Sequence, residues 1–125
     1  MGMYTELVLK CTVSSEAPIK VREVLHFLFG AGSDPVTLPD HEFFECPRWK
    51  CIGNMSSFYH HPSQVNSLLE QCGDIHIFSR SDLKSYDGEI YKFIEWLKPY
   101  ASCTEGECLG WTWYEEEVTP TLILK

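Results

Sequence analysis

The last twenty residues of the chain, 106–125, read GECLGWTWYEEEVTPTLILK and carry its clearest pattern. Bulky and small side chains alternate from Leu109 to Trp113, which is the period of a β-strand. A turn follows, and TPTLILK then returns as a second strand, so the stretch predicts a terminal hairpin. Trp111 and Trp113 share one side of the first strand with Leu109, and we expect both tryptophans to pack in the core under helices.

The first half of the chain predicts a strand, a helix and another hairpin. In YTELVLKCTV (4–13) alternate residues are apolar, as in a half-buried strand. APIKVREVLHFLFG (17–30) places apolar residues at i, i+3, i+4 and i+7, which predicts an amphipathic helix that Gly30 ends. RWKCIGNMSSFYHH (48–61) then predicts a strand, a Gly-Asn turn and a second strand.

The second half of the chain continues with similar elements. PSQVNSLLEQCG (62–73) predicts a short helix, DIHIFSRSDLKS (74–85) a strand, and YDGEIYKFIEWLKPY (86–100) a second amphipathic helix. The predicted fold is a single α+β domain over residues 1–125, with a mainly antiparallel sheet and two amphipathic helices on one face. The order of elements is compatible with a doubled βαββ arrangement.

The charge of the chain narrows the class of partner. Ten Lys and Arg against eighteen Asp and Glu give a formal net charge of −8. This balance disfavours direct binding to nucleic acid and favours a basic or neutral partner. The sequence lacks both a long apolar run and the features of a leader peptide, so we expect a cytoplasmic protein without a membrane partner.

The six cysteines do not predict a metal site. Cys46 and Cys51, and likewise Cys103 and Cys108, are separated by four residues, whereas structural zinc sites usually present pairs separated by two. In a reducing compartment free cysteines behave as small apolar residues. We therefore expect six free thiols and neither a metal nor another cofactor.

The sequence shows no signature of catalysis. No nucleophile-elbow, phosphate-loop, dinucleotide-binding or kinase motif is present. Asp82, Asp87 and Glu89 flank the start of a predicted helix, where carboxylates are expected because they offset the positive end of the helix dipole. We therefore predict a protein that is not an enzyme.

Several stretches resemble one family. MYTELVLK (3–10), LPDHEFF (38–44) followed by RW, LKSYDGEIYKFIEWLKPY (83–100) and GECLGWTWYEEEVTPTLI (106–123) resemble small uncharacterised proteins encoded by bacteriophages and prophages. The resemblance implies a bacterial host cytoplasm and carries over no catalytic residue. The order of elements is also similar to that of gyrase-inhibitor-like small-molecule-binding domains, but fold alone does not fix function.

The predicted binding residues come from the two expected hairpins. Charged residues at a strand end guard against edge-to-edge pairing, and they also form acidic docking patches. We expect a host protein with a basic surface to bind there, with a homodimer left open. The alternative is a domain that binds a small molecule, or sequesters a nucleotide, in an aromatic pocket on the sheet. The predicted partner-binding residues are Tyr114, Glu115, Glu116 and Glu117 with Arg48 and Trp49.

Overall fold

The computed structural model describes residues 3–57 and 63–125. Its five strands form one antiparallel sheet in the order β2-β3-β1-β4-β5. The strands are β1 (Thr5–Val13), β2 (Val65–Gln71), β3 (Asp74–Leu83), β4 (Cys108–Tyr114) and β5 (Thr121–Leu124). The α-helices are α1 (Ile19–Phe29) and α2 (Glu89–Leu97), and the 3-10 helices are η1 (Glu42–Glu45), η2 (Trp49–Cys51) and η3 (Lys98–Tyr100).

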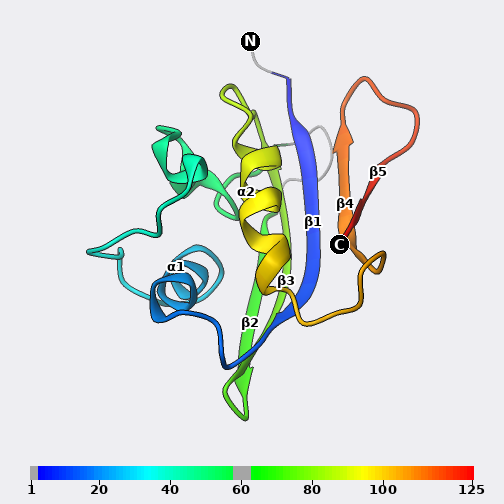
Figure 1. Ribbon diagram of the computed structural model, residues 1–125. Helices are drawn as coiled ribbons and strands as arrows, with labels where there is room; N and C mark the ends of the chain where they lie inside the picture. The colour runs from blue at the N-terminus through cyan, green and yellow to red at the C-terminus, as the bar shows by residue number, and fades with distance from the viewer. Residues whose placement is uncertain (1–2, 58–62) are drawn as a thin grey trace.

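Both α-helices lie on the same side of the sheet (Figure 1). α1 connects β1 to β2, which flank β3, and α2 connects β3 to β4, which flank β1. These two crossovers form the split βαβ arrangement of ferredoxin-like domains, and β5 extends the sheet. The predicted α+β class, antiparallel sheet and helix-covered face are confirmed. The doubled βαββ arrangement is not confirmed, because β3 serves both in the first hairpin and as the strand before α2.

The core lies between the helices and one face of the sheet. Leu7, Leu9 and Val13 alternate along β1 and are fully buried, because a strand turns every second side chain to the same face. Their partners on β3 include Ile75, paired with Val13. The apolar stripes of the two helices close this layer, with the buried residues Val21, Val24, Leu25, Leu28, Phe29, Ile90, Phe93, Trp96 and Leu97.

The hairpin predicted for 48–61 is wrong where the structure describes it, and residues 58–61 lie outside the described residues. Trp49 belongs to η2 and is only 5% exposed. Its ring centroid lies 5.9 Å from that of Phe27, 6.1 Å from Phe43 and 5.2 Å from Phe44. Burial of these rings in one cluster outweighs the weak strand preference of the segment.

The helix predicted for 62–73 is also wrong, because Val65–Gln71 is strand β2 and pairs with β3. Cys72 and Gly73 join the two strands with φ angles of 54° and 83°. Such left-handed conformations at both central positions are those of a tight two-residue hairpin turn. The adjacent Leu68 and Leu69 lie on opposite faces of the sheet, as successive residues of a strand do.

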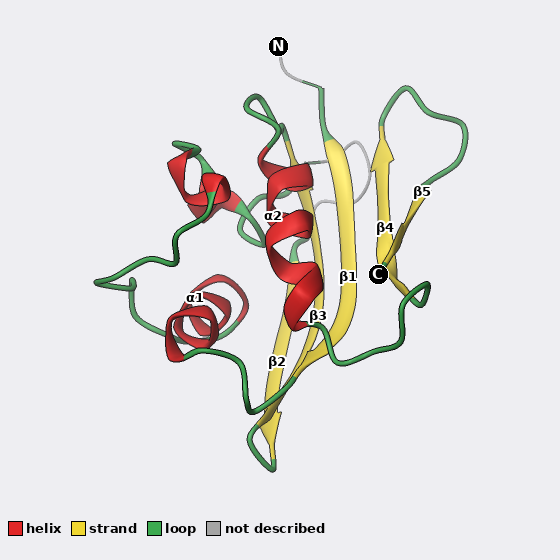
Figure 2. Cartoon of the chain, in the orientation of Figure 1, coloured by secondary structure: helices red, strands yellow, loops and turns green. Residues whose placement is uncertain are grey.

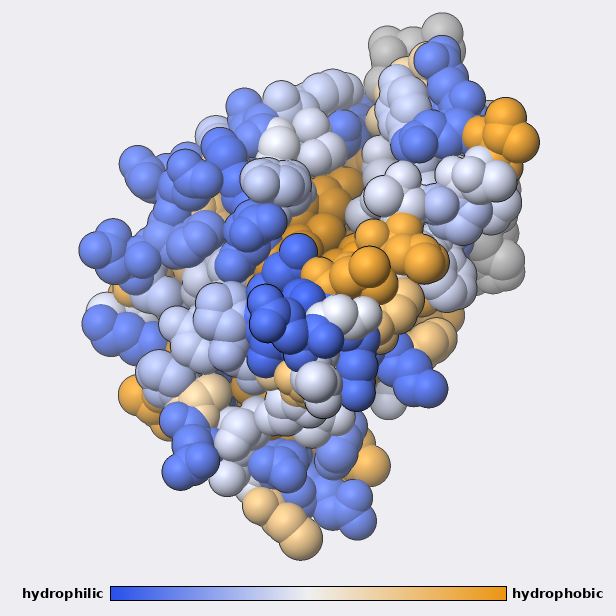
Figure 3. All heavy atoms as spheres, turned by 45° about the vertical axis from the view of Figure 1, so that its right-hand side comes forward, coloured by the Kyte–Doolittle hydropathy of each residue, from blue (hydrophilic) through white to orange (hydrophobic). Residues whose placement is uncertain are grey.

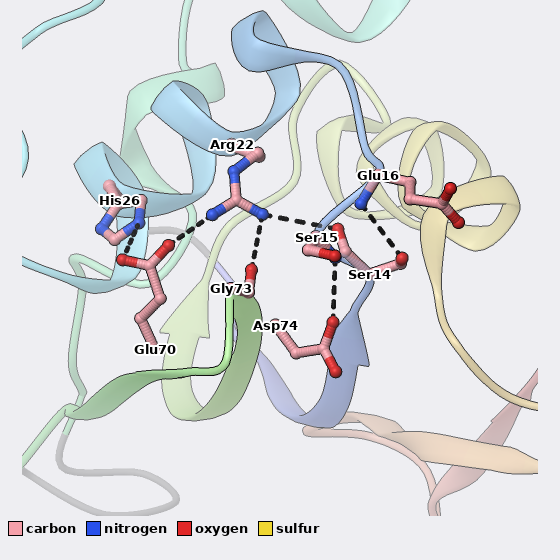
Figure 4. Close-up of polar contacts among 8 residues, drawn as sticks. All are labelled: Ser14, Ser15, Glu16, Arg22, His26, Glu70, Gly73 and Asp74. Carbon is pink, nitrogen blue, oxygen red and sulfur yellow. Dashed lines mark hydrogen bonds and ion pairs between the residues drawn. The ribbon is translucent and has the colours of Figure 1, made fainter.

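A polar cluster holds α1 on the β2–β3 hairpin (Figure 4). The guanidinium of Arg22 donates to the carbonyl oxygen of Gly73 at 2.8 Å and pairs with the carboxylate of Glu70. At the same turn, the Asp74 carboxylate accepts a hydrogen bond from the backbone N–H of Ser15 at 2.9 Å. Since backbone and carboxylate groups occupy the Arg22 guanidinium, we assign it a structural role.

Candidate functional site

The second face of the sheet carries no helix in the described part of the chain (Figure 2). Residues that lie directly opposite each other on neighbouring strands share a face. One such row crosses all five strands, and its members are Val65, Arg80, Val8, Trp111 and Leu122. We call this surface the open face; it comprises Glu6, Val8, Lys10, Thr12, Val65, Ser67, Leu69, His76, Phe78, Arg80, Asp82, Trp111, Trp113, Leu122 and Leu124.

Large apolar side chains are exposed on the open face. Phe78 is 44% exposed, and Leu69 and Leu122 are each 59% exposed. Val65 and Leu124, at the two edges of the sheet, are exposed as well. From the side of β4 and β5, apolar patches are visible next to strongly polar ones (Figure 3). Apolar side chains gathered on one face are typical of binding surfaces, whereas single exposed ones are ordinary.

Two adjoining hollows form a groove in the open face. One has a volume of about 520 Å³ and the other about 390 Å³, and both are lined by Lys10, Phe78, Cys108 and Leu109. We call them the first and second hollow, and together the groove. The first continues over Thr12, Leu69 and His76, and the second over Val8 and Trp111. These volumes lie within the roughly 300–1,000 Å³ that small-molecule sites occupy.

A bulge in β4 shapes the shared wall of the two hollows. Cys108 pairs with Leu124 and Gly110 with Ile123, so Leu109 is the extra residue between them. Gly110 has a φ of 141°, and a Cβ atom there would lie 1.9 Å from the carbonyl oxygen of Val8. Only glycine allows β4 to approach β1 this closely.

Lys10 is the unpaired cation of the groove. Its side chain is exposed, its cross-strand partner is Phe78, and it makes no ion pair with any residue in 3–57 or 63–125. Beside it, Thr12 Oγ1 and His76 Nδ1 are hydrogen-bonded at 2.9 Å. A lysine between apolar walls, with a hydroxyl and an imidazole nearby, offers a few polar contacts in an otherwise apolar site.

The second cation of the open face is neutralised by its neighbours. Arg80 Nε lies 2.7 Å from Glu6 Oε2, and Arg80 Nη2 lies 2.9 Å from Asp82 Oδ1. Asp82 is fully buried, and its other carboxylate oxygen accepts from the backbone N–H of Ser57 at 3.0 Å. This network stabilises the end of β3 against β1, because a buried carboxylate needs such partners.

Trp111 contributes an unsatisfied donor to the open face. Its indole Nε1 is enclosed and has no hydrogen-bond acceptor among the described residues. Buried N–H groups without a partner are uncommon in folded proteins and call for an explanation. The indole of Trp113, by contrast, donates to the carbonyl oxygen of Glu117 at 2.9 Å.

The predicted position of the two tryptophans under the helices is wrong. Trp111 is paired with Val8 and Trp113 with Glu6, both on the open face, and both indoles are half-buried. Alternation shows which residues share a face but not which face the helices cover. The bulge at Leu109 also breaks the alternation on which the prediction rested.

The four predicted binding residues at 114–117 lie at the end of β4. Tyr114 is half-buried, and Glu116 and Glu117 are exposed. Glu115 is held in place, because its Oε1 accepts from the backbone N–H of Tyr4 at 2.6 Å. Glu116 and Glu117 are therefore the members of this set that are presented to solvent.

Arg48 and Trp49 are adjacent in the sequence but have different surroundings. Trp49 is buried in the aromatic cluster, whereas Arg48 is about one-third exposed and lies 3.8 Å from the carboxylate of Glu89. The Arg48 guanidinium also lies 5.2 Å from the ring centroid of Tyr86. Arg48 therefore belongs to an exposed rim near the end of β3, and Trp49 belongs to the core.

That rim connects Arg48 to the acidic end of β4 through a row of contacts. Lys84 lies 5.8 Å from the ring of Tyr86 and 5.3 Å from the ring of Tyr4. The backbone N–H of Tyr4 in turn donates to Glu115. The structure thus links two of the predicted binding residues, although by alternating cations and aromatic rings and not through adjacent hairpins.

The next residues are the cysteines and the carboxylates that the sequence places near the start of α2. All six cysteines are free thiols, and burial, with a smaller effect from Cys103, raises the pKa of the Cys11 thiol from 9.0 to about 12. No group of three His, Cys, Asp or Glu in the described residues could hold a metal ion. Glu89 lies in the first turn of α2, and its Oε1 accepts from the backbone N–H of Asp87 at 2.8 Å.

The groove residues were missed by the sequence prediction, although part of their signal was present. Lys10 and Thr12 fall on the side of the first strand opposite its leucines, and His76 and Phe78 fall opposite Ile75 and Ile77. A phenylalanine on the polar side of a strand indicates a binding face only when other apolar residues gather on the same face. What the sequence does not show is that these two sides meet on neighbouring strands.

Comparison of the chain with models of protein families, with curated proteins and with solved structures found no match. Within residues 3–57 and 63–125, neither α-helix has the length and apolar character that crossing a membrane requires.

Proposed function

We propose that this chain is a non-catalytic binding protein that holds a small aromatic molecule in the groove of the open face. The observation that carries the proposal is the groove itself, in which two hollows share Lys10, Phe78, Cys108 and Leu109. Apolar walls with a few polar groups are the usual composition of a ligand site. From the sequence resemblance we further propose that a bacteriophage or prophage encodes it and that it acts in the cytoplasm of the bacterial host.

Binding without catalysis is supported by the state of the reactive groups near the groove. Arg80 and Asp82 neutralise each other, so they do not form an acid–base pair open to a ligand. The thiol of Cys11 lines the first hollow, but its pKa of about 12 keeps it protonated and therefore weakly nucleophilic at neutral pH. His76 is hydrogen-bonded to the Thr12 hydroxyl, but no carboxylate among the described residues pairs with its ring to orient it as a base.

A larger hollow beside α1 is a weaker candidate site. Its volume is about 560 Å³, and it is bounded by the loop at 32–37 and by Arg22, His26 and Glu70. Arg22 pairs with Glu70, and His26 Nε2 lies 4.0 Å from the same carboxylate. Both basic side chains of this hollow therefore face the Glu70 carboxylate, unlike Lys10 in the groove.

A neutral aromatic probe tests the proposed function. Titration with 2-naphthylmethanol, followed by NMR, should shift the indole N–H resonance of Trp111, which lines the second hollow, and leave those of the buried Trp49 and Trp96 in place. Phe78→Ala should weaken this binding, because Phe78 lines both hollows. Tyr91→Ala is the matched control, since Tyr91 is an exposed aromatic residue on α2. Unchanged indole resonances on the open face would refute the proposal.

A second candidate function is the binding of a host protein with a basic surface. The observation in its favour is the exposure of Glu116 and Glu117 near the edge strand β5, where Leu122 and Leu124 are also exposed. An acidic rim beside an apolar surface is a common composition for protein interfaces. The test is capture of a host protein by the wild type and by Glu116→Lys/Glu117→Lys at several salt concentrations. Recovery of the wild-type chain without any bound host protein would count against this function.

A further inference from the structure

We infer that the ligand of the groove is an aromatic monoanion, such as a small aromatic carboxylate, bound with its ring in the second hollow and its charge at Lys10. This inference rests on the proposed function and adds the chemical class of the ligand. It follows from the charges around the groove, from the walls of the second hollow and from the polar groups of the first.

The walls of the second hollow suit an aromatic ring. Phe78 and Trp111 line it together with Val8 and Leu109, so the hollow presents two aromatic and two aliphatic side chains. Aromatic rings stack on one another or meet edge to face with a gain of about 0.5–1.5 kcal/mol beyond burial. A planar aromatic molecule therefore uses this hollow better than an aliphatic chain of equal size.

The charges around the groove point to a single negative charge on the ligand. Lys10 lines both hollows and makes no ion pair in the described part of the chain. Arg80 lines only the second hollow, and Glu6 and Asp82 already neutralise it. One unpaired ammonium matches one carboxylate, whereas a nucleotide with several phosphate charges needs a cluster of cations.

Charged residues outside the groove also favour a monoanion over a nucleotide with several phosphate charges. Basic residues outside the groove that could meet the phosphates of a nucleotide are engaged elsewhere, with Arg48 at 3.8 Å from Glu89 and Lys50 at 2.7 Å from Asp34. Lys84 lies over the rings of Tyr4 and Tyr86. The net charge of −8 also repels polyanions at long range, so the attraction to an anion must be local.

The two ends of the groove define the orientation of the ligand. Glu107 lines the first hollow and not the second, so its carboxylate disfavours an anion placed deep in the first hollow rather than at its boundary with the second. Lys10 marks the boundary between the hollows, with the Thr12 hydroxyl and the His76 imidazole on the side of the first. A carboxylate at this boundary receives the ammonium and has hydrogen-bonding groups beside it, while the ring extends toward Trp111.

Three probes with the same ring system and different charges separate the contribution of the charge to affinity from that of the ring. They are 2-naphthoate, 2-naphthylmethanol and 2-naphthylmethylammonium, which are anionic, neutral and cationic at pH 7. Each is titrated into the full chain at low salt, and dissociation constants are obtained from NMR shifts of backbone amides in β1, β3 and β4. The same titrations are run on Lys10→Gln and on Lys20→Gln, because Lys20 is an exposed lysine of α1 remote from the groove lining.

We expect 2-naphthoate to bind about tenfold more tightly than either other probe, as one charge-assisted contact in a partly desolvated groove provides. Lys10→Gln should remove this preference, and Lys20→Gln should retain it. Higher salt should weaken the binding of 2-naphthoate and leave that of 2-naphthylmethanol unchanged.

The outcomes that overturn the inference differ from those that overturn the proposed function. If all three probes bind equally well, or if Lys10→Gln leaves the preference for 2-naphthoate intact, the groove binds rings without recognising an anion and only the inference fails. If no probe shifts the resonances of β1, β3 and β4, both the inference and the proposed function fail.

Discussion

Replacing Phe93 by alanine should destabilise the protein far more than replacing Phe78 by alanine. Phe93 lies on α2 in the core, whereas Phe78 lies on the open face of the sheet. Phe93 is fully buried, and its ring centroid lies 5.9 Å from Phe29, 5.4 Å from Phe43 and 6.0 Å from Trp96. Removing a buried phenylalanine costs about 3–5 kcal/mol, and the loss of three ring contacts places the expected value toward the upper end.

Phe78 is 44% exposed, so its truncation removes only about half of the burial energy of a full side chain, or roughly 1 kcal/mol. The assay is urea unfolding monitored by circular dichroism, with the free energy of unfolding taken from the midpoint and slope. Against a total stability of about 5–15 kcal/mol, Phe93→Ala leaves a marginal domain, and its Tm should fall by about 10–20 °C. Similar costs for the two variants would refute the assignment of a covered and an open face.

The remaining predictions concern the cysteines, the acidic rim and the polar cluster at α1. Iodoacetamide at pH 8.5 should label the exposed Cys72 and Cys108 in the folded protein and spare Cys11, whereas all six thiols should react after denaturation; early labelling of Cys11 would contradict its burial. Because the pKa of Cys11 is 9.0 unfolded and about 12 folded, its contribution to stability is complete below pH 9 and is lost as the pH rises toward 12, which urea midpoints across that range would detect. Glu116→Lys with Glu117→Lys changes the net charge by +4, from −8 to −4, and should alter the free energy of unfolding by no more than about 0.5 kcal/mol while weakening capture of a basic partner at low salt. Arg22→Ala should destabilise the fold by about 1–3 kcal/mol, since the carbonyl of Gly73 and the carboxylate of Glu70 lose their partner; Lys20→Ala on the same helix is the control.

Sequence periodicity was sufficient where an element has one buried side. The first strand, both α-helices, the strand at 74–85 and the terminal hairpin are present as predicted, and their apolar spacing matches the buried residues. Leu25 on α1 and Phe93 on α2 are fully buried at the positions that the helical period indicated.

Periodicity failed where both sides of an element carry apolar residues. It also failed where contacts between aromatic rings from distant segments determine the local structure. β2 places Leu68 against the core and Leu69 on the open face, and such adjacent apolar residues also fit a helix. Trp49 is buried in a 3-10 helix because of rings contributed by η1 and α1, which no local pattern reveals. For Trp111 the error was the choice of face, since only the sheet order shows which side the helices cover.

The candidate site depends on contacts between distant residues and was therefore the least predictable part. Lys10 and Phe78 are cross-strand partners, although they are far apart in the sequence, and the bulge at Leu109 brings β4 to the same groove. The acidic residues 115–117 were recognisable as a charged run, but the anchoring of Glu115 by the backbone of Tyr4 was not.

The central claim is that the groove of the open face binds aromatic molecules, and intermolecular NOEs with 2-naphthoate test it most directly. We expect NOEs from the naphthalene protons to the side chains of Phe78, Leu109 and Trp111, which line the second hollow. NOEs to Pro35 and Val36 instead, which border the hollow beside α1, would contradict it.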